Sequence, residues 1–219
     1  MIGLWRRLRP RRRRSATVEG LADFLAARTA FVSQKSTIEY CRARAGIGWG
    51  KLFLEDEFGR AMEFCRWEAY AAVLEDLAEV ALTWLRHGGA QGPEIVDGLA
   101  AATRAALLRH PAPAHRAGWD ETLAAVEARL HRALLAAPRP VHEVGRGSGR
   151  RVFKVLPIHT NLTAQDREVV VNNVRFLLCR AYADMEAELD RSALLALLSG
   201  PTSPAAGGVG HGAAPPGPP

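Results

Sequence analysis

No stretch of this sequence holds the roughly 20 consecutive apolar residues that a membrane-spanning helix needs. The N-terminus also lacks the apolar segment of a secretory signal, so we expect a cytoplasmic protein. Cysteine is scarce: Cys41, Cys65 and Cys179 lie far apart and form no CxxC pair. This spacing favours reduced thiols over a disulfide framework or a zinc site, and we expect no bound metal.

Sequence signatures of catalysis and of cofactor binding are missing as well. Neither GxxxxGK[ST] nor GxGxxG occurs, and the glycines of residues 46–51 have the wrong spacing for either pattern. The serine-hydrolase pattern GxSxG is absent, because residues 145–149 place the serine one position too late. We therefore expect no cofactor, and the sequence favours a protein without catalytic activity.

Acidic residues are absent from the first 14 residues, which contain seven arginines. The formal net charge of the chain is +6, yet the remainder carries 22 basic and 23 acidic residues. The excess positive charge therefore belongs to the N-terminal arm, which we define as residues 1–16. We expect no large basic face on the folded body, although this balance leaves room for a small local one.

The N-terminal arm combines its arginines with an apolar side. So short a helix is unstable in water, but an anionic membrane surface would stabilise it, each arginine contributing about 1 kcal/mol. Nucleic-acid phosphates would attract the same charge without needing the apolar side, so we favour the inner membrane surface over nucleic acid. An unstructured tail with no dedicated partner stays open beside these two alternatives. The residues assigned to membrane contact are Leu4, Trp5, Arg6, Arg7, Leu8 and Arg9.

Apolar residues recur at helical spacing between the arm and a C-terminal tail rich in glycine and proline. We predict a helical domain at residues 17–198 and a disordered tail at residues 199–219. The fold class is all-α, a bundle of about six helices. The predicted helices span residues 18–45, 57–86, 93–109, 120–136, 163–190 and 194–198, with a further short one that contains Leu52 and Phe53.

Two segments interrupt the helical pattern. Prolines and glycines are concentrated in residues 137–150, which predicts a linker. Residues 151–156 follow, and their sequence RVFKVL is the one segment typical of a strand. We therefore expect a single short strand or hairpin there, and a minimal sheet at most.

Charged residues on the first long helix are the strongest indication of a site. Arg28, Lys35 and Arg42 are spaced by seven, and a helical projection places them, with Glu39, inside the apolar stripe. On the second long helix, Arg66 and Asp76 also fall within the apolar stripe. Buried charges need partners, so the first interpretation is an internal ion-pair network in which Glu39 and Asp76 neutralise the cations.

The second interpretation is a binding site, because the cations of this set outnumber the acids by two. A pocket with surplus positive charge suits a carboxylate or a phosphate. The partner would be a small anionic ligand or an anionic segment of another protein. The residues predicted to form this site are Arg28, Lys35, Glu39, Arg42 and Arg66.

Three segments of the chain resemble a known group of proteins. They are TAFVSQKSTIEYCRARAGIGWGKLF, EFCRWEAYAAVLEDLAEVA and LPIHTNLTAQDREVVVNNVRFLLCRAYADMEAELD, within residues 18–190. The group comprises small, uncharacterised bacterial proteins, some of which carry the automatic label "esterase". The resemblance implies an ester hydrolase, with Ser33 or Ser36 and His159 as the catalytic material. The sequence departs from esterases in having neither the GxSxG elbow nor a sheet to hold one.

These observations predict a non-catalytic helical binding or adaptor protein. Its body would hold an anionic ligand or partner, and its arm would touch the inner membrane surface. A small hydrolase acting on esters is the second hypothesis, and nucleic-acid binding through the arm is the third.

Overall fold

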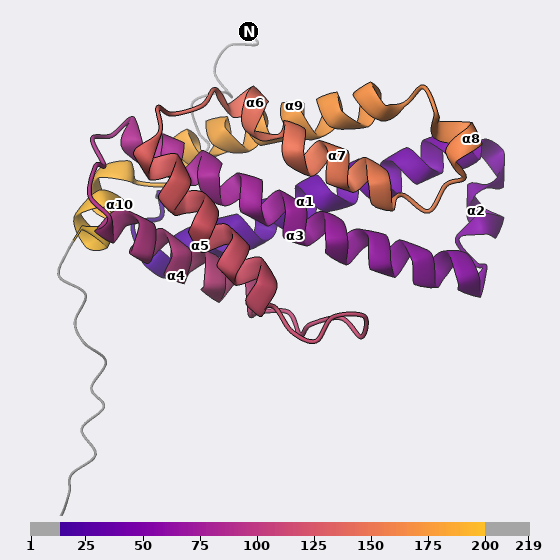
Figure 1. Cartoon of the computed structure of the whole chain (residues 1–219), viewed down its shortest axis with the longest axis horizontal. Coiled ribbons are helices and arrows are strands. Elements are labelled where there is room, and N and C mark those ends of the chain that lie inside the picture. Colours follow the sequence, from indigo (N-terminus) through magenta and orange to yellow (C-terminus); the bar gives the residue numbers. More distant parts are fainter. Residues whose placement is uncertain (1–13, 200–219) are drawn as a thin grey trace, which may run out of the picture.

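The computed structural model describes residues 14–199. In that part of the chain the fold is all-α, as predicted, and helices pack side by side in an elongated bundle (Figure 1). Only an isolated bridge between Ser15 and Leu189 has strand-like pairing there. The elements are α1 (Val18–Ala45), the 3-10 turn η2 (Gly46–Gly48), α2 (Trp49–Leu52), α3 (Asp56–Arg86), α4 (Glu94–Leu107), α5 (Asp120–Leu135), α6 (Val141–Val144), α7 (Arg146–Val155), α8 (Thr160–Thr163), α9 (Arg167–Glu188) and α10 (Arg191–Leu198).

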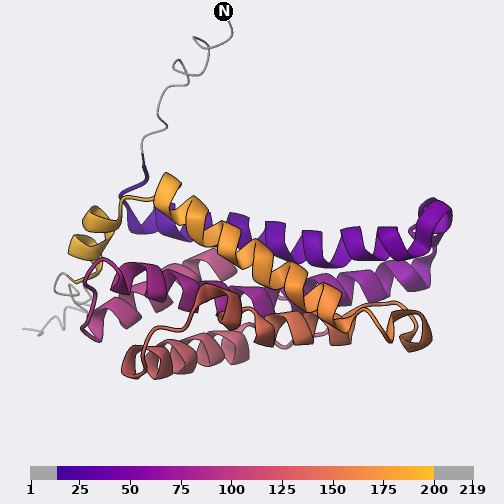
Figure 2. The same cartoon turned by 90° about the horizontal axis from the view of Figure 1, so that it is seen from above.

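Helix α3 is the centre of the bundle. Every residue from Ala69 to Leu85 is buried, so this part of the helix is covered on all sides. The covering helices are α1, α4, α5, α7 and α9, and Figure 2 shows α1 and α9 lying along one side of the bundle. Three acidic residues lie within this buried segment, and they position the candidate site described below.

Local sequence signals set several of the helix ends. The Thr17 hydroxyl accepts a hydrogen bond from the Gly20 amide at 3.0 Å and caps α1. Helix α1 ends at Ala45, and the next residue, Gly46, has a φ of +56°, in the left-handed region that favours glycine. The Asp190 carboxylate accepts from the Ala193 amide at 3.1 Å and caps α10. The predicted bounds of the first long helix are correct to the residue.

The strand or hairpin predicted at residues 151–156 is wrong, and the linker predicted at residues 137–150 is wrong in its second half. Residues 141–144 and 146–155 form the helices α6 and α7, so the bundle has more helices than the predicted six. The glycines of this segment allow close packing against α9. A Cβ on Gly149 would lie 2.9 Å from the Val171 Cα, and one on Gly145 would lie 3.2 Å from the Arg175 Cα. Tertiary contact outweighs the low helix propensity of glycine here.

The helix predicted at residues 163–190 begins later than expected. Thr163 ends the short helix α8, and α9 starts at Arg167. No helix within residues 14–199 is long and apolar enough to cross a membrane. The arm residues assigned to membrane contact, Leu4 to Arg9, lie outside the described residues, as does the tail from residue 200, so those assignments stay predictions.

Candidate anion-binding site

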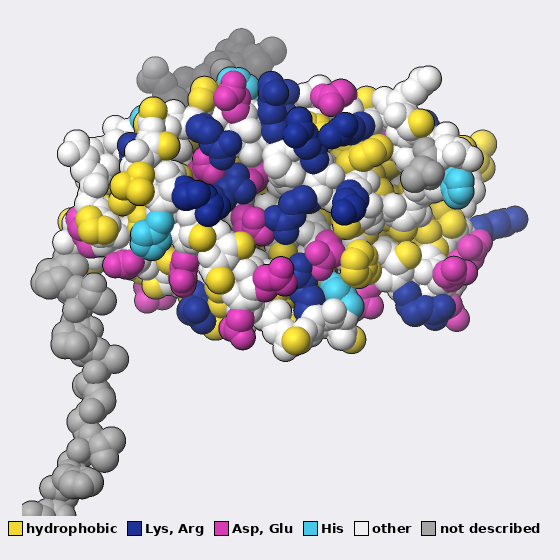
Figure 3. All heavy atoms as spheres, viewed as in Figure 1, with side chains coloured by type: hydrophobic (Ala, Val, Ile, Leu, Met, Phe, Trp, Pro, Cys, Tyr) yellow, Lys and Arg dark blue, Asp and Glu magenta, His cyan; other side chains and the backbone are white. Residues whose placement is uncertain are grey.

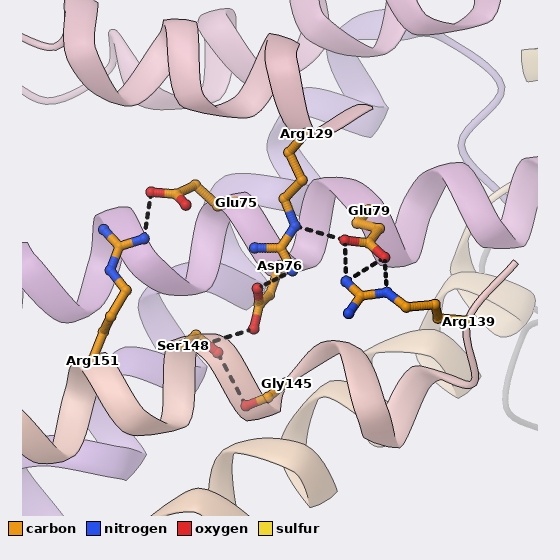
Figure 4. Close-up of polar contacts among 8 residues, drawn as sticks. All are labelled: Glu75, Asp76, Glu79, Arg129, Arg139, Gly145, Ser148 and Arg151. Carbon is orange, nitrogen blue, oxygen red and sulfur yellow. Dashed lines mark hydrogen bonds and ion pairs between the residues drawn. The ribbon is translucent and has the colours of Figure 1, made fainter. Parts of the chain in front are cut away.

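Helix α3 carries three acidic side chains in its buried middle: Glu75, Asp76 and Glu79. Asp76 is completely buried, and the other two are less than a tenth exposed. Buried carboxylates cost several kcal/mol each unless cations and hydrogen bonds compensate them. In this protein the compensation comes from arginines of α5, α7 and the segment that follows α5 (Figure 4).

Asp76 joins α3 to both α5 and α7. One carboxylate oxygen lies 2.5 Å from Nη2 of Arg129 on α5. The other accepts a hydrogen bond of 3.1 Å from the backbone amide of Ser148, in the first turn of α7. Helix α7 has no side-chain cap of its own, so Asp76 satisfies one of the free amides at its N-terminus.

Glu79 is held by two arginines. Arg129 donates from Nε to the carboxylate at 2.6 Å. Arg139 donates to it twice, from Nε at 2.8 Å and from Nη2 at 2.7 Å. Glu75 accepts a hydrogen bond of 2.7 Å from Nη1 of Arg151. All three buried acids are therefore ion-paired. The contact between Arg139 and Glu79 is bidentate, and arginine–carboxylate contacts of that kind are among the stronger ones.

Burial raises the pKa of Asp76 to about 6, although Arg129 and Ser148 act in the opposite direction. Burial also lowers the pKa of Arg129, but the neighbouring carboxylates of Asp76 and Glu79 outweigh it and raise that pKa. Arg129 consequently keeps its charge, while Asp76 titrates well above an ordinary aspartate.

A cleft of about 470 Å³ lies beside this network, between α3, α5 and the segment that follows α5. Arg129 and Arg139 line it with their partner Glu79, and so does Glu75. Two further arginines line the cleft, Arg86 and Arg132. The cleft is therefore rich in arginine.

Arg86 and Arg132 have no carboxylate partner within residues 14–199. Arg86 donates from Nη1 to the carbonyl oxygens of Ala133 and Ala136, both at 2.8 Å. These contacts fix the guanidinium but leave its charge uncompensated. Arg132 is exposed and makes neither an ion pair nor a hydrogen bond there. With the three acids already paired, the cleft carries surplus positive charge.

Helix α7 extends the positive charge beyond the cleft. Four of its residues are exposed cations, and no acid occurs from residue 144 to residue 165. Figure 3 shows lysine and arginine side chains gathered on the face where α5, α6 and α7 lie. This is the small local basic surface that the charge balance left open. The four cations of α7 are Arg146, Arg150, Arg151 and Lys154.

The predicted site on α1 is not assembled as a pocket. Lys35, Glu39 and Arg42 are exposed, so the prediction that they lie inside the buried stripe of α1 is wrong. Glu39 is 3.9 Å from Lys35 and 3.7 Å from Arg42, which forms a surface ion-pair cluster within one helix. The Arg42 guanidinium also stacks over the Trp49 ring, 4.4 Å from its centroid.

The remaining two residues of that predicted site lie elsewhere. Arg28 is partly buried and pairs with two acids of α9: Asp184, at 3.2 Å, and Glu188. Arg66 is exposed on α3 and borders a separate small pocket. The predicted internal ion-pair network is correct only in that Glu39 pairs with Lys35 and Arg42, and these pairs lie at the surface. Arg28 pairs with acids of α9, and Asp76 pairs with Arg129 instead.

The buried face of α1 is partly polar, and this explains the error. Thr29, Ser33, Ser36 and Thr37 are all buried, whereas Phe31 is exposed. The hydroxyls of Ser33 and Thr37 donate to carbonyl oxygens one turn earlier, at 2.7 and 2.8 Å. Small hydroxyl side chains satisfied by their own helix can face a core, and a projection based on apolar residues alone misses them.

The serine and histidine residues proposed for ester hydrolysis are not hydrogen-bonded to one another in the described part of the chain. The Ser33 hydroxyl donates a hydrogen bond to the Thr29 carbonyl oxygen. The Ser36 hydroxyl has no hydrogen-bond partner within residues 14–199. His159 lies at the start of α8, where its Nδ1 accepts from the Asn161 amide at 3.3 Å. No hydrogen bond links either serine to His159 in that part of the chain.

Sequence reasoning identified one member of the candidate site, Asp76, as a charge within an apolar stripe. It missed Glu75, Glu79 and their arginines. Three acids within an otherwise apolar helix segment do indicate buried charges that need cationic partners. Comparison with known proteins gives no further indication of the function of this site, because no family model, no curated protein and no solved structure matches this chain.

Proposed function

We propose that this protein is a non-catalytic binding or adaptor module whose α3–α5 cleft holds an anionic group, a carboxylate or a phosphate, of a small ligand or a partner protein. The observation that carries the proposal is the pair of cleft arginines, Arg86 and Arg132, that lack a carboxylate partner within residues 14–199. The buried acids cannot neutralise them, because Arg129, Arg139 and Arg151 already occupy those acids.

The chemistry of the cleft supports an oxyanion as the ligand. A guanidinium presents several donors in a planar fork that matches the oxygens of a carboxylate or phosphate. Carbonyl contacts hold Arg86 in place before any ligand arrives, which lowers the ordering cost of binding. The α7 cations Arg146, Arg150 and Lys154, which have no ion pair within residues 14–199, would add long-range attraction for a larger anionic partner.

Titration calorimetry with inorganic phosphate, at low ionic strength, tests this proposal. We expect saturable binding that weakens with added salt. Arg132→Gln should weaken binding at least tenfold without changing the melting temperature, because Arg132 is exposed and unpaired.

Arg60→Gln is the matched control. Arg60 is also an exposed cation without an ion pair in the described residues, but it lies near the start of α3, 15 residues and about 22 Å from Glu75. The Arg60→Gln variant should bind phosphate with the same affinity as the unmodified protein. Equal affinities for the Arg132 and Arg60 variants, or no saturable binding, would reject the cleft as an anion site.

We also propose that the N-terminal arm attaches the protein weakly to the inner membrane surface. Its arginines and the apolar Leu4, Trp5 and Leu8 support this. Ester hydrolysis receives no such support, since Ser33 and His159 are not hydrogen-bonded to each other.

A further inference from the structure

A second hollow follows the same central helix as the α3–α5 cleft. It lies between α3 and α7 and has a volume of about 500 Å³. The acid in its lining, Glu68, is already compensated, because Arg116 donates to both of its carboxylate oxygens, at 2.7 and 2.8 Å. Like the cleft, this hollow therefore presents cations without a surplus of acid. Its lining residues are Phe64, Glu68, Arg151, Lys154 and Val155.

The two hollows lie on one face of α3. The residues of α3 that line them fall within an arc of about 100° when each residue advances the helix by 100°. They are Phe64, Glu68, Glu75, Glu79, Leu82, Thr83 and Arg86. From the first to the last of these residues, α3 rises by about 33 Å.

An ion pair joins the two hollows into one groove. Glu75 lines the α3–α5 cleft, and its partner Arg151 lines the second hollow. Figure 4 shows this face of α3 between α5 and α7, with Arg151 reaching from α7 to Glu75. We call the two hollows together the α3 groove. Its length exceeds that of a small anion several times.

Unpaired cations lie on both sides of the α3 groove. Arg86 and Arg132 border it at the α5 end. On α7, Arg146, Arg150 and Lys154 are exposed and form no ion pair within residues 14–199. These three are spaced by four, so they follow one face of α7 at intervals of about 6 Å. The groove therefore suits a partner with several anionic groups along its length.

The apolar lining distinguishes an acidic peptide from a nucleic acid. Bases of a single strand bind mainly by stacking on aromatic rings. None of the described residues that line the α3–α5 cleft is aromatic, and its apolar lining suits aliphatic side chains instead. Phe64, 42% exposed, adds apolar surface at the other end of the groove. The apolar residues of the cleft are Leu82, Ala125, Ala128, Ala133, Ala136, Ala137 and Pro138.

We propose that the α3 groove binds an acidic segment of a partner protein, in which aspartate or glutamate alternates with aliphatic residues. This inference rests on the proposed function, because Arg86 and Arg132 form one end of the groove. An extended segment rises about 3.3 Å per residue, so about ten residues cover the groove. Side chains on one side of it repeat about every 6.6 Å, close to the spacing of the α7 cations. Its carboxylates face those cations, and its aliphatic side chains pack on the alanines of α5.

Fluorescence anisotropy with a labelled peptide tests the proposal on the full chain at low ionic strength. The probe is a capped decapeptide of alternating aspartate and leucine, and we expect saturable binding. Replacing every aspartate by asparagine should lower the affinity about tenfold or more, because the charge contacts are lost. Replacing every leucine by serine should lower it about threefold or more, because the apolar contacts are lost.

Two double variants locate the bound peptide. Arg150→Gln/Lys154→Gln should lower the peptide affinity about tenfold and leave the fold intact, since both side chains are exposed and unpaired within residues 14–199. Lys51→Gln/Arg180→Gln removes the same charge from exposed, unpaired residues that line neither hollow, and it should leave the affinity unchanged.

Phosphate binding separates this inference from the proposed function. Arg150→Gln/Lys154→Gln should change the phosphate affinity by about twofold at most, because both residues lie outside the α3–α5 cleft. Arg132→Gln should weaken the binding of both probes. Saturable phosphate binding without peptide binding would therefore reject this inference alone, whereas loss of both would reject the cleft as well.

Three outcomes overturn the proposal. The first is the absence of saturable peptide binding. The second is an equal peptide affinity for the two double variants, which would place the peptide elsewhere on the chain. The third concerns a ten-nucleotide uridine RNA: if Arg150→Gln/Lys154→Gln lowers its affinity by a larger factor than that of the peptide, the groove binds nucleic acid instead.

Discussion

The carboxylate of Asp76 on α3 accepts a hydrogen bond from the backbone amide of Ser148, 72 residues later, at the N-terminus of α7. The same carboxylate pairs with Arg129 on α5. One buried side chain thus holds two helices against the central one, in a region whose sequence is rich in glycine and lacks a local cap.

Asp76 should make stability depend on pH in an unusual direction. Its pKa is about 6 in the folded protein and about 3.8 in the unfolded chain, so the folded state binds the proton more tightly. As pH rises from about 4 to 6, the unfolded chain releases this proton first, and the free energy of unfolding falls. By proton linkage, the free energy of unfolding falls by on the order of 3 kcal/mol over this interval.

Asp76→Asn removes this titration. Urea unfolding between pH 4 and pH 7 should show the variant losing less stability than the unmodified protein over that interval. If the free energy of unfolding changes with pH in the same way for both proteins, the raised pKa of Asp76 is contradicted.

The packing of α7 against α9 should depend on Gly149 and not on Gly147. A Cβ at Gly149 would lie 2.9 Å from the Val171 Cα, which is backbone and cannot rotate away. Gly149→Ala should therefore lower the free energy of unfolding by about 1–3 kcal/mol. Gly147→Ala is the matched control, since its nearest neighbour is 3.9 Å away, and it should raise stability by about 0.5–1 kcal/mol. Chemical unfolding of both variants checks this, and a similar loss in both would disprove the steric explanation.

Arg28 should couple α1 to α9 energetically. A double-mutant cycle with Arg28→Gln and Asp184→Asn should give an interaction energy of about 0.5–1 kcal/mol, because both groups are partly buried. The control cycle uses Lys35→Gln and Glu39→Gln, an exposed pair within α1, and should give about 0.5 kcal/mol or less. A larger coupling in the control cycle would show that exposure does not govern these pairs.

Removal of residues 1–13 tests the membrane role proposed for the arm. The full chain should float with vesicles that contain anionic lipid, at low salt, and the shortened chain should not. Vesicles of neutral lipid serve as the control. Equal flotation of both chains would remove the membrane role, and an RNA-binding salt slope that is steeper only for the full chain would favour nucleic acid instead.

The sequence by itself determined the all-α class and the bounds of the first long helix, because helical periodicity, the Thr17 cap and Gly46 are local signals. It also identified Asp76 as a charge in an apolar stripe. Tertiary structure alone decided that residues 146–155 form a helix, since contact with α9 and α3 offsets the low propensity of their glycines. It alone placed Arg86, Arg129, Arg132 and Arg139 around one cleft, because they come from three separate segments whose convergence no local pattern encodes. It also turned the Lys35 face of α1 to the solvent, since Ser33, Ser36 and Thr37 occupy the core instead.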